Sequence, residues 1–378
     1  MKNTQRQPGL NLLRAIAILW VMPFHSFIVG GLGDDWGWLS KYGWMGVDIF
    51  FVLSGYLIGG QVLQQLHDRA RIDFRDFYLR RALRILPAFW VVLAVYVLFP
   101  SWHEVDGMEP WWKFASFLYN LSVDYTANPV FSHAWSLCVE EHFYLMFPLL
   151  AMWLFRRNSL LLCIAAIVFV LLGGIALRSA IWLHDDALKP DRNWFIEDIY
   201  YPTWCRLDGL LAGVALAAMK VFRPQWWLCL RTYANAAALF GLLGVALSFR
   251  LHAERGGLLA NSIGWPVLSW SFALLVFAAA ERDSWIGRWH VPGAGWIAAI
   301  SYSLYLSHKL VMHAIHVAID DRIHGIAAFP MYALAILATG ALLHYAVERP
   351  CLRLRDRLLS RRPADAIIAP SISANDAQ

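Results

Sequence analysis

A series of long apolar stretches constrains the fold of this chain more than any other feature of its sequence. Each stretch has about 18 to 23 residues, enough for an α-helix to cross the roughly 30 Å hydrocarbon core of a bilayer. They are predicted at residues 10–29, 43–63, 82–100, 133–155, 160–178, 203–222, 233–251, 263–280, 296–318 and 330–347. The pattern predicts an all-α, polytopic integral membrane protein with about ten transmembrane helices.

The composition favours a bilayer as the solvent of this chain. Only 16% of the 378 residues are charged and 59% are hydrophobic, whereas a soluble domain usually has about 25% charged residues. The first apolar stretch is longer than the roughly 7 to 15 apolar residues of a cleaved signal and has no small-x-small cleavage site, so we expect a permanent helix. The five cysteines show no CxxC or other ligand spacing, so neither a disulfide framework nor a metal site is expected.

The distribution of positive charge predicts the orientation. About two thirds of the 32 Lys and Arg residues lie before the first stretch, in alternate loops and after the last stretch, and such enrichment marks cytoplasmic segments. Both termini are therefore predicted in the cytoplasm, N-in and C-in. The Arg clusters lie beside hydrophobic segments without a nucleic-acid-binding motif, so the net charge of +5 is assigned to topology and no nucleic-acid partner is expected.

The segments between the apolar stretches differ between the two sides. On the outer side, residues 101–132 and 179–202 are acidic and aromatic, and each is long enough to form a lid or an acceptor platform. Residues 363–378 are polar and rich in small side chains, which predicts a disordered cytoplasmic tail. Residues 1–362 are then expected to form one membrane domain, without a soluble second domain.

Ionisable residues inside the apolar stretches are the first candidates for function, because a charge in a bilayer is costly. Arg14 and His25 are eleven residues apart on one predicted helix, which leaves only about 20° of rotation and about 16 Å of axial distance between them. Arg14 then lies near the cytoplasmic entrance and His25 near the outer third. Asp48, about 7 Å below the outer end of the second helix, reaches a depth close to that of His25.

Other costly groups are predicted in the same outer layer. They are Glu140, Glu141, Arg206, Asp208, His308 and Lys309. A shared polar cavity would explain this common depth. Charges that pair only to fix helix packing are the alternative for Glu141, Arg206, Asp208 and Lys309. His142 and His313 are better explained as core histidines, and the cluster Arg80, Arg81 and Arg84 would also serve as a topology determinant.

Six segments together resemble a known family. They are LNLLRAIAILWVMPFH (Arg14, His25), GVDIFFVLSGYLI (Asp48, Ser54, Gly55), FYLRRALRILPAFW (Arg80, Arg81, Arg84, Pro87), SLCVEEHFYL (Glu140, Glu141), CRLDGLLAG (Arg206, Asp208) and ISYSLYLSH (His308). The chain resembles the membrane-bound acyltransferase family 3, which includes bacterial acyltransferases of O-antigen, exopolysaccharide, peptidoglycan and nodulation factors. It differs in having His142 where many members have Gln. It also lacks the C-terminal esterase-like domain of some longer members, so we expect transfer to be completed by the membrane domain or a separate partner.

The resemblance implies an O-acyltransferase of the bacterial inner membrane that carries an acyl group, most often acetyl, from cytoplasmic acyl-CoA to a glycan or lipid-linked glycan. Acetyl-CoA would be the donor substrate, and no bound cofactor is expected. Cytoplasmic Arg80, Arg81 and Arg84 would hold the CoA phosphates, and the pantetheine arm would pass Arg14.

At the end of that arm, His25 would act as general base toward a sugar hydroxyl. Asp48 or Glu140 would orient the imidazole, while Glu141, Arg206, Asp208 and His308 would support the site. Direct transfer and an acyl-histidine intermediate both remain open. Lipopolysaccharide O-antigen and exopolysaccharide are the expected acceptors.

Two other classes of function are compatible with parts of the sequence. Intramembrane Asp, Glu, His and Arg residues also build proton relays, so a proton-coupled transporter or exporter is the main alternative. The absence of evident inverted repeats disfavours it. A non-enzymatic scaffold in glycan assembly is disfavoured by the family motifs.

Overall fold

The computed structural model of the chain describes residues 7–29, 37–319 and 327–360, and these residues are helical without any strand. The predicted all-α fold is therefore confirmed for the described part of the chain. The predicted disordered tail at 363–378 lies outside the described residues.

The helices follow one another with short connections. The α-helices are α1 (Pro8–Val29), α2 (Gly37–Tyr42), α3 (Met45–Ser54), α4 (Gly60–Arg69), α5 (Phe74–Leu98), α6 (Trp111–Ala115), α7 (Trp135–Arg157), α8 (Leu160–Leu188), α9 (Asp208–Phe222), α10 (Pro224–Leu230), α11 (Ala234–Leu251), α12 (Trp265–Ala280), α13 (Trp285–Arg288), α14 (Ala294–Ile319), α15 (Phe329–Leu343) and α16 (Arg349–Ser360). Short π-helical turns adjoin several of these helices. η2 (Gly55–Gly59) links α3 to α4, η9 (Ala260–Gly264) precedes α12, and η11 (His344–Glu348) links α15 to α16.

Eight helices of the described residues are long and apolar enough to cross a membrane. They are Pro8–Ser26, Met45–Arg69, Phe74–Leu98, Ser132–Arg157, Leu160–Leu188, Pro224–Leu251, Ala260–Ala280 and Phe329–Ser360. The other two predicted spans are helical as α9 and α14, but α9 has only 15 residues and α14 is not among the eight. The chain has the character of a multi-pass membrane protein, while ten crossings and the N-in, C-in orientation stay predictions.

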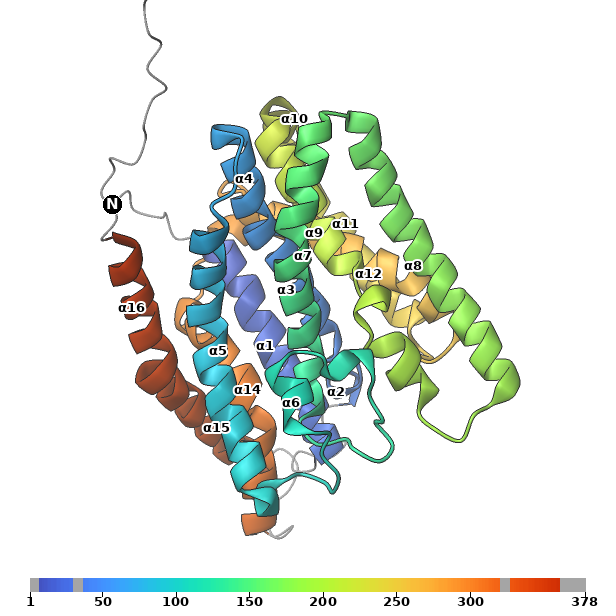
Figure 1. Cartoon of the computed structure of the whole chain (residues 1–378), viewed down its shortest axis with the longest axis vertical. Coiled ribbons are helices and arrows are strands. Elements are labelled where there is room, and N and C mark those ends of the chain that lie inside the picture. Colours follow the sequence, from blue (N-terminus) through green and yellow to red (C-terminus); the bar gives the residue numbers. More distant parts are fainter. Residues whose placement is uncertain (1–6, 30–36, 320–326, 361–378) are drawn as a thin grey trace, which may run out of the picture.

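The connections gather at the two ends of one helical bundle (Figure 1). The turns between α4 and α5, between α7 and α8 and between α9 and α10 lie at the upper end, as does the end of α16. These are the Arg-rich segments that the charge pattern assigns to the cytoplasm. The short helices α2 and α6 and the last residues of α8 lie at the opposite end.

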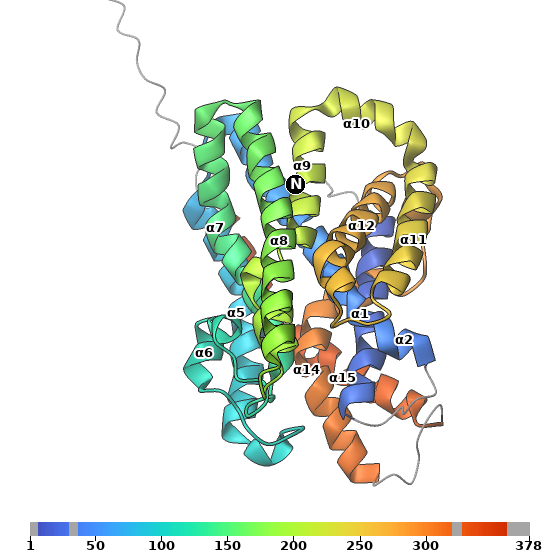
Figure 2. The same ribbon diagram turned by 90° about the vertical axis from the view of Figure 1, so that its right-hand side faces the viewer.

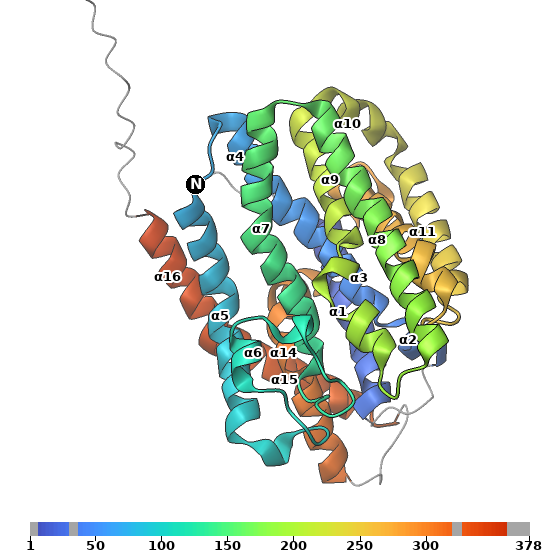
Figure 3. The same cartoon turned by 45° about the vertical axis from the view of Figure 1, so that its right-hand side comes forward.

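The other two views show where the outer helices of the bundle lie. When the molecule is turned by 90°, α8 crosses the front of the bundle, with α9, α10 and α11 on its right (Figure 2). α16 runs beside α5 at the left edge (Figure 3). Inside this ring α1 packs against α3 and α14, so the helix that carries Arg14 and His25 lies at the centre of the bundle.

A glycine seam holds α3 and η2 against α9. A Cβ on Gly213 would overlap the carbonyl oxygen of Val52, and a Cβ on Gly55 would overlap that of Leu210. Small residues allow the close backbone approach that stabilises helix pairs in a membrane. The seam fixes α9 on the face of α3 that points away from α1.

Several predicted boundaries differ from the observed ones. α5 begins at Phe74 and not near residue 82, and its N-cap Asp73 accepts a hydrogen bond from the Asp76 amide at 3.0 Å. α8 continues to Leu188, so the predicted outer loop at 179–202 is shorter than expected. In both cases charged residues occupy full helical turns at the end of an apolar stretch, where hydropathy alone does not detect the helix.

Candidate active site

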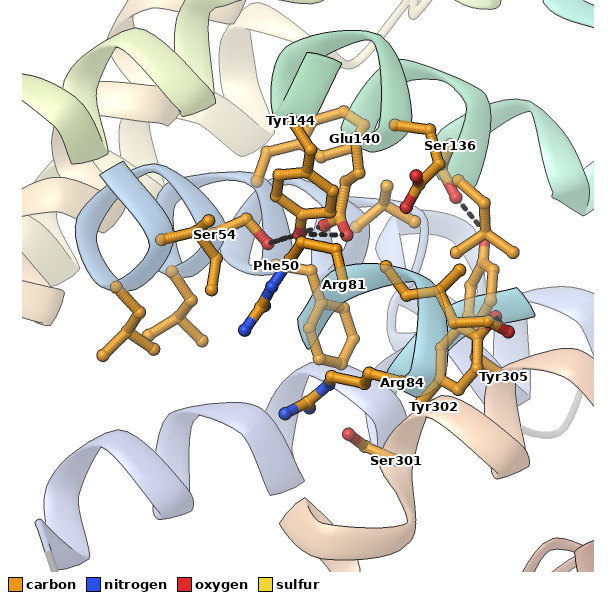
Figure 4. A pocket seen from close by; sticks show the side chains of 18 of the residues that line it. Phe50, Ser54, Arg81, Arg84, Ser136, Glu140, Tyr144, Ser301, Tyr302 and Tyr305 are labelled. Carbon is orange, nitrogen blue, oxygen red and sulfur yellow. Dashed lines mark hydrogen bonds between the residues drawn. The ribbon is translucent and has the colours of Figure 1, made fainter. Parts of the chain in front are cut away.

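A cavity of about 120 Å³ lies between α1, α3, η2, α5, α7 and α14 (Figure 4). Its apolar wall comes mostly from α3 and η2. Its polar lining is Arg14, Ser54, Arg81, Arg84, Ser136, Glu140, Glu141, Tyr144, Ser301, Tyr302 and Tyr305. These six helices and turns bring together side chains that are as much as 291 positions apart in the sequence, between Arg14 and Tyr305.

The cationic part of the lining comes from α1 and α5. Arg14 belongs to the second turn of α1, while Arg81 and Arg84 lie in the first half of α5. Arg81 is buried, and its guanidinium lies 6.0 Å from the centre of the Tyr144 ring. Three arginines thus line one cavity, and guanidinium groups are well suited to contact anionic groups such as phosphates.

Arg80, the third member of the predicted phosphate cluster, is not part of this lining. Its side chain is 43% exposed and forms an ion pair with Asp76 at 2.9 Å, one helical turn earlier. Consecutive helical positions point about 100° apart, so Arg80 and Arg81 could not both face the cavity. Arg80, Arg81 and Arg84 were predicted to hold the donor phosphates together, and of these three Arg81 and Arg84 line the cavity.

Two carboxylates also belong to the lining of the cavity. Glu140 accepts hydrogen bonds from the Ser54 hydroxyl at 2.8 Å and from the Tyr144 hydroxyl at 2.9 Å. The neighbouring Glu141 also lines the cavity, and its Oε1 is buried without a hydrogen-bond partner among the described residues. Glu140 is thus held in place, whereas Glu141 has an oxygen available to a group that enters.

A hydrogen-bonded triangle closes the end of the cavity away from the arginines. The Tyr305 hydroxyl donates to the carbonyl oxygen of His133 at 2.9 Å, and the Ser136 hydroxyl lies 2.7 Å from the Tyr305 oxygen. In Figure 4, Tyr305 and Ser136 lie opposite the ends of Arg81 and Arg84. The phenol ring therefore separates the cavity from the segment that carries His133.

Beyond this triangle lie three buried imidazoles. His25 Nδ1 is 2.9 Å from His308 Nε2, and the ring of His133 lies 5.1 Å from that of His308 and 6.1 Å from that of His25. No group of His, Cys, Asp and Glu residues in the described chain is arranged to hold a metal ion. The direct contact between His25 and His308 is consistent with a proton relay.

The bond of His308 to its own helix fixes the direction of that relay. His308 Nδ1 lies 2.7 Å from the carbonyl oxygen of Tyr305, which can only accept, so Nδ1 carries the hydrogen. In a neutral imidazole the other nitrogen is then an acceptor. His25 must donate from Nδ1 to His308 Nε2, which leaves the lone pair of His25 on Nε2.

A buried ion pair ties the outer loop to the helix of His308. Lys309 Nζ lies 2.6 Å from Glu104 Oε1, and both side chains are at most 4% exposed. Lys309 also donates to the Ser132 hydroxyl at 3.3 Å. Burial opposes the charge on Glu104, but the attraction of Lys309 outweighs it and lowers the pKa of Glu104 below its ordinary value. This pair anchors residues 99–131 over the histidines.

Asp48 does not contact His25. Its Oδ1 accepts from Arg206 Nη2 at 2.8 Å, and the Arg206 guanidinium lies 3.7 Å from the centre of the Trp265 ring. The depth of Asp48 was predicted from its position along α3, but the glycine seam turns this face of α3 toward α9. Asp48 or Glu140 was predicted to orient His25, whereas in the structure His25 Nδ1 lies 2.9 Å from His308 Nε2.

Two more predicted residues have structural partners. Asp208 forms a buried ion pair with Arg178 at 2.8 Å, and His142 Nδ1 lies 2.7 Å from the Thr203 hydroxyl. The alternative of paired charges that fix helix packing thus describes the surroundings of Arg206 and Asp208.

Several residues of this site were not predicted from the sequence. His133, Ser136 and Tyr305 were not among the predicted site residues. The depth argument applied to the other ionisable residues would have identified His133, since it lies at the outer start of the same helix as Glu140. Ser136 and Tyr305 have no such signal, because uncharged hydroxyl groups are common in membrane helices.

Known proteins resemble this chain along most of its length. A family model described as an acyltransferase domain matches residues 7–345. A protein of Bacillus subtilis with the provisional name peptidoglycan O-acetyltransferase is 30% identical over 81% of this chain and 48% of its own length. The peptidoglycan O-acetyltransferase of Listeria monocytogenes is 28% identical over 82% of this chain and 50% of its own length.

A protein of Staphylococcus aureus with the provisional name O-acetyltransferase is 27% identical over 96% of this chain and 60% of its own length. The chain therefore spans about half to three fifths of the length of these relatives. No solved structure gives a significant match.

Proposed function

The chain belongs to the acyltransferase family whose model matches residues 7–345, and from this premise we propose that it transfers an acetyl group from acetyl-CoA to a hydroxyl of a cell-envelope glycan. The reaction would take place in the bacterial inner membrane, with donor supplied from the cytoplasm and acceptor from the outside. One observation carries the proposal: a cavity lined by three arginines is bounded by Tyr305, whose ring lies 5.7 Å from that of His308, and His308 Nε2 lies 2.9 Å from His25 Nδ1.

The donor fits the charge and shape of the cavity. CoA combines an anionic nucleotide with a long, thin pantetheine arm, and guanidinium groups bind phosphate oxygens in a bidentate manner. Arg14, Arg81 and Arg84 supply three such groups at the cavity. A space of about 120 Å³ suits the narrow arm better than the nucleotide, so the thioester would point toward Tyr305 and the histidines.

His25 is the proposed general base. Its Nε2 lone pair would take the proton of the acceptor hydroxyl as that oxygen attacks the thioester carbonyl carbon. The carbon–sulfur bond then breaks, and the departing CoA sulfur takes the proton from the imidazolium, which returns His25 to its neutral form. The same lone pair would serve as nucleophile in a two-step route through acyl-histidine, so both routes depend on the tautomer set by His308.

His308 is proposed as a positioning residue. It accepts the hydrogen of His25 Nδ1 and holds the imidazole in one tautomer, the part that an orienting carboxylate plays in a catalytic triad. Glu140 and Glu141 are assigned to the donor cavity, where Glu141 has an oxygen without a partner. Asp48, Arg206 and Asp208 support the packing around α9.

Peptidoglycan is the first acceptor to test. The relatives of Bacillus subtilis and Listeria monocytogenes both carry it in their names. Lipopolysaccharide O-antigen and exopolysaccharide present the same chemical group, a secondary or primary sugar hydroxyl, and belong in the same assay.

Transfer by purified, reconstituted protein tests the proposal. Wild-type protein should consume acetyl-CoA and release CoA in the presence of a cell-envelope glycan, and His25→Ala should reduce single-turnover transfer by about 10²- to 10⁴-fold at saturating donor. His308→Gln keeps a carbonyl oxygen that can accept from His25, so it should retain more activity than His308→Leu. Both His308 variants should leave the KM for acetyl-CoA close to that of the wild type.

The two histidines should also behave as one unit. The double variant His25→Ala with His308→Leu should be no slower than His25→Ala alone, because a tautomer has no role once the base is absent. A well-folded His25→Ala protein with near-normal transfer would remove His25 from the mechanism.

A further inference from the structure

Tyr305 lies between the cavity and the buried histidines and contacts both. Its ring lines the donor cavity, and it also lies 5.7 Å from the ring of His308 and 5.6 Å from that of His133. Its own carbonyl oxygen accepts the hydrogen of His308 Nδ1. The residue is thus the partition between the space for the donor and the histidines.

The partition is held rigidly. The Tyr305 hydroxyl donates to the His133 carbonyl at 2.9 Å and lies 2.7 Å from the Ser136 hydroxyl, and all three residues are buried. The Ser136 hydroxyl also lies 3.3 Å from the His133 carbonyl oxygen, so the two hydroxyl groups and this carbonyl form a closed set of contacts. A ring fixed at both its backbone and its hydroxyl has little freedom to move aside for a larger group.

The apolar wall of the cavity consists of packed side chains that add no further space. Val47 and Phe51 of α3 and Leu137 of α7 line the same cavity, and Val47 and Phe51 are at most 5% exposed. Packed interiors of this kind resist the insertion of extra methylene groups. In the proposed reaction the acyl group of the thioester lies between this wall and the Tyr305 ring, at the end of the cavity that is next to the histidines.

We propose that Tyr305, clamped by Ser136 and the His133 carbonyl, is the residue that restricts the donor to short acyl groups, with acetyl as the substrate class. This inference rests on the proposed function, since it concerns the same donor site. Acetyl fits beside the ring, whereas each further methylene of propionyl or butyryl meets the phenol or the α3 wall. The pantetheine arm is the same in all these acyl-CoA donors. Donors with longer acyl groups therefore bind at the arginines, but their acyl group is not transferred.

The inference is tested by measuring kcat/KM for acetyl-CoA and butyryl-CoA with the same glycan acceptor. The wild type should prefer acetyl-CoA by about 10- to 200-fold or more, the range that small differences in an apolar pocket produce. Tyr305→Leu should reduce this preference at least about tenfold, because the ring is removed. Tyr305→Phe keeps the ring and should keep the preference.

Tyr302→Leu is the matched control. Tyr302 lines the same cavity one turn earlier on α14, and its hydroxyl donates to the Ile85 carbonyl at 2.8 Å. The pantetheine arm, and not the acyl group, would pass this residue, so the preference should stay that of the wild type. If Tyr305→Leu does not fold, Ser136→Gly removes the hydroxyl that contacts Tyr305 in the cavity lining and should relax the preference in the same direction.

The outcomes separate this inference from the proposed function. A wild-type protein that uses butyryl-CoA as well as acetyl-CoA would contradict the proposed role of Tyr305 in restricting the acyl group. The proposed acyltransferase activity would stand. An active Tyr305→Leu protein with the wild-type preference would lead to the same conclusion. A wild-type protein that consumes neither donor instead contradicts the proposed function. Inhibition of acetyl transfer by butyryl-CoA in the wild type is the expected sign that longer donors bind without reacting.

Discussion

At the scale of single residues, the two neighbouring arginines of α5 differ in their surroundings. Arg84 lines the cavity, whereas Arg80 forms an exposed ion pair with Asp76. We expect Arg84→Gln to raise the KM for acetyl-CoA about 10-fold or more, with a smaller change in kcat, because anchoring of phosphates is mostly uniform binding. Arg80→Gln should leave both constants near those of the wild type. Steady-state kinetics of the two variants checks this, and equal effects would mean that the arginines act only through their charge near the membrane surface.

The same residues show what the sequence could predict of the site. Helical spacing placed Arg14 and His25 on one face of α1, and depth placed His25 and His308 in one layer. Depth does not say which helices face each other, so Asp48 was predicted beside His25 although it binds Arg206. Contacts between helices depend on packing details such as the glycines of α3 and α9, which one sequence does not reveal.

At the scale of elements, the outer loop at 99–131 depends on one buried ion pair. Glu104→Gln would leave the Lys309 charge buried without its partner, which typically costs about 3–5 kcal/mol in the free energy of unfolding. The double variant Glu104→Gln with Lys309→Met should be clearly less destabilised than the single one, because no charge is then left alone. Thermal unfolding in detergent checks the difference, with Asp356→Asn from the exposed pair with Arg355 as a control that should change stability by less than about 1 kcal/mol.

The ion pair between Glu104 and Lys309 also makes the stability of the folded protein depend on pH. The pKa of Glu104 is lowered in the folded protein, so its stabilising effect is fully present above the ordinary pKa of a glutamate and is lost as the pH falls through the lowered value. The loop should therefore stay anchored at neutral pH and loosen only in acid. A destabilisation of Glu104→Gln that is equally large at acid pH would contradict this assignment.

Elements were predicted well where apolar stretches are uniform and poorly where charged turns extend them. The basic first turns of α5 and the charged last turns of α8 are helical beyond the predicted ends. Hydropathy reports which residues favour lipid, not where backbone hydrogen bonding ends. The π-helical turns η2, η9 and η11 leave no pattern that a hydropathy window could detect.

At the scale of the whole molecule, the orientation is open to a direct test. Cys229 on α10 is the exposed one of the five cysteines and lies at the Arg-rich end of the bundle. In a variant with Cys163 and Cys351 changed to Ser, a membrane-impermeant thiol reagent should label Cys229 in inside-out vesicles and not in intact cells. Asp186→Cys, at the exposed opposite end of α8, should show the reverse in a Cys229→Ser background. Labelling of Cys229 from outside would invert the predicted N-in, C-in topology and with it the side that supplies the donor.

The glycine seam has a mechanical consequence for substrate traffic. Since no Cβ fits at Gly55 or Gly213, α3 and α9 are in backbone contact and move as one body, so the apolar wall that α3 gives to the cavity is immobile. The walls from α5, α7 and α14 have no such contact with α3. Opening of the cavity to any substrate would then depend on movement of those three helices, with the α3–α9 pair as the fixed frame.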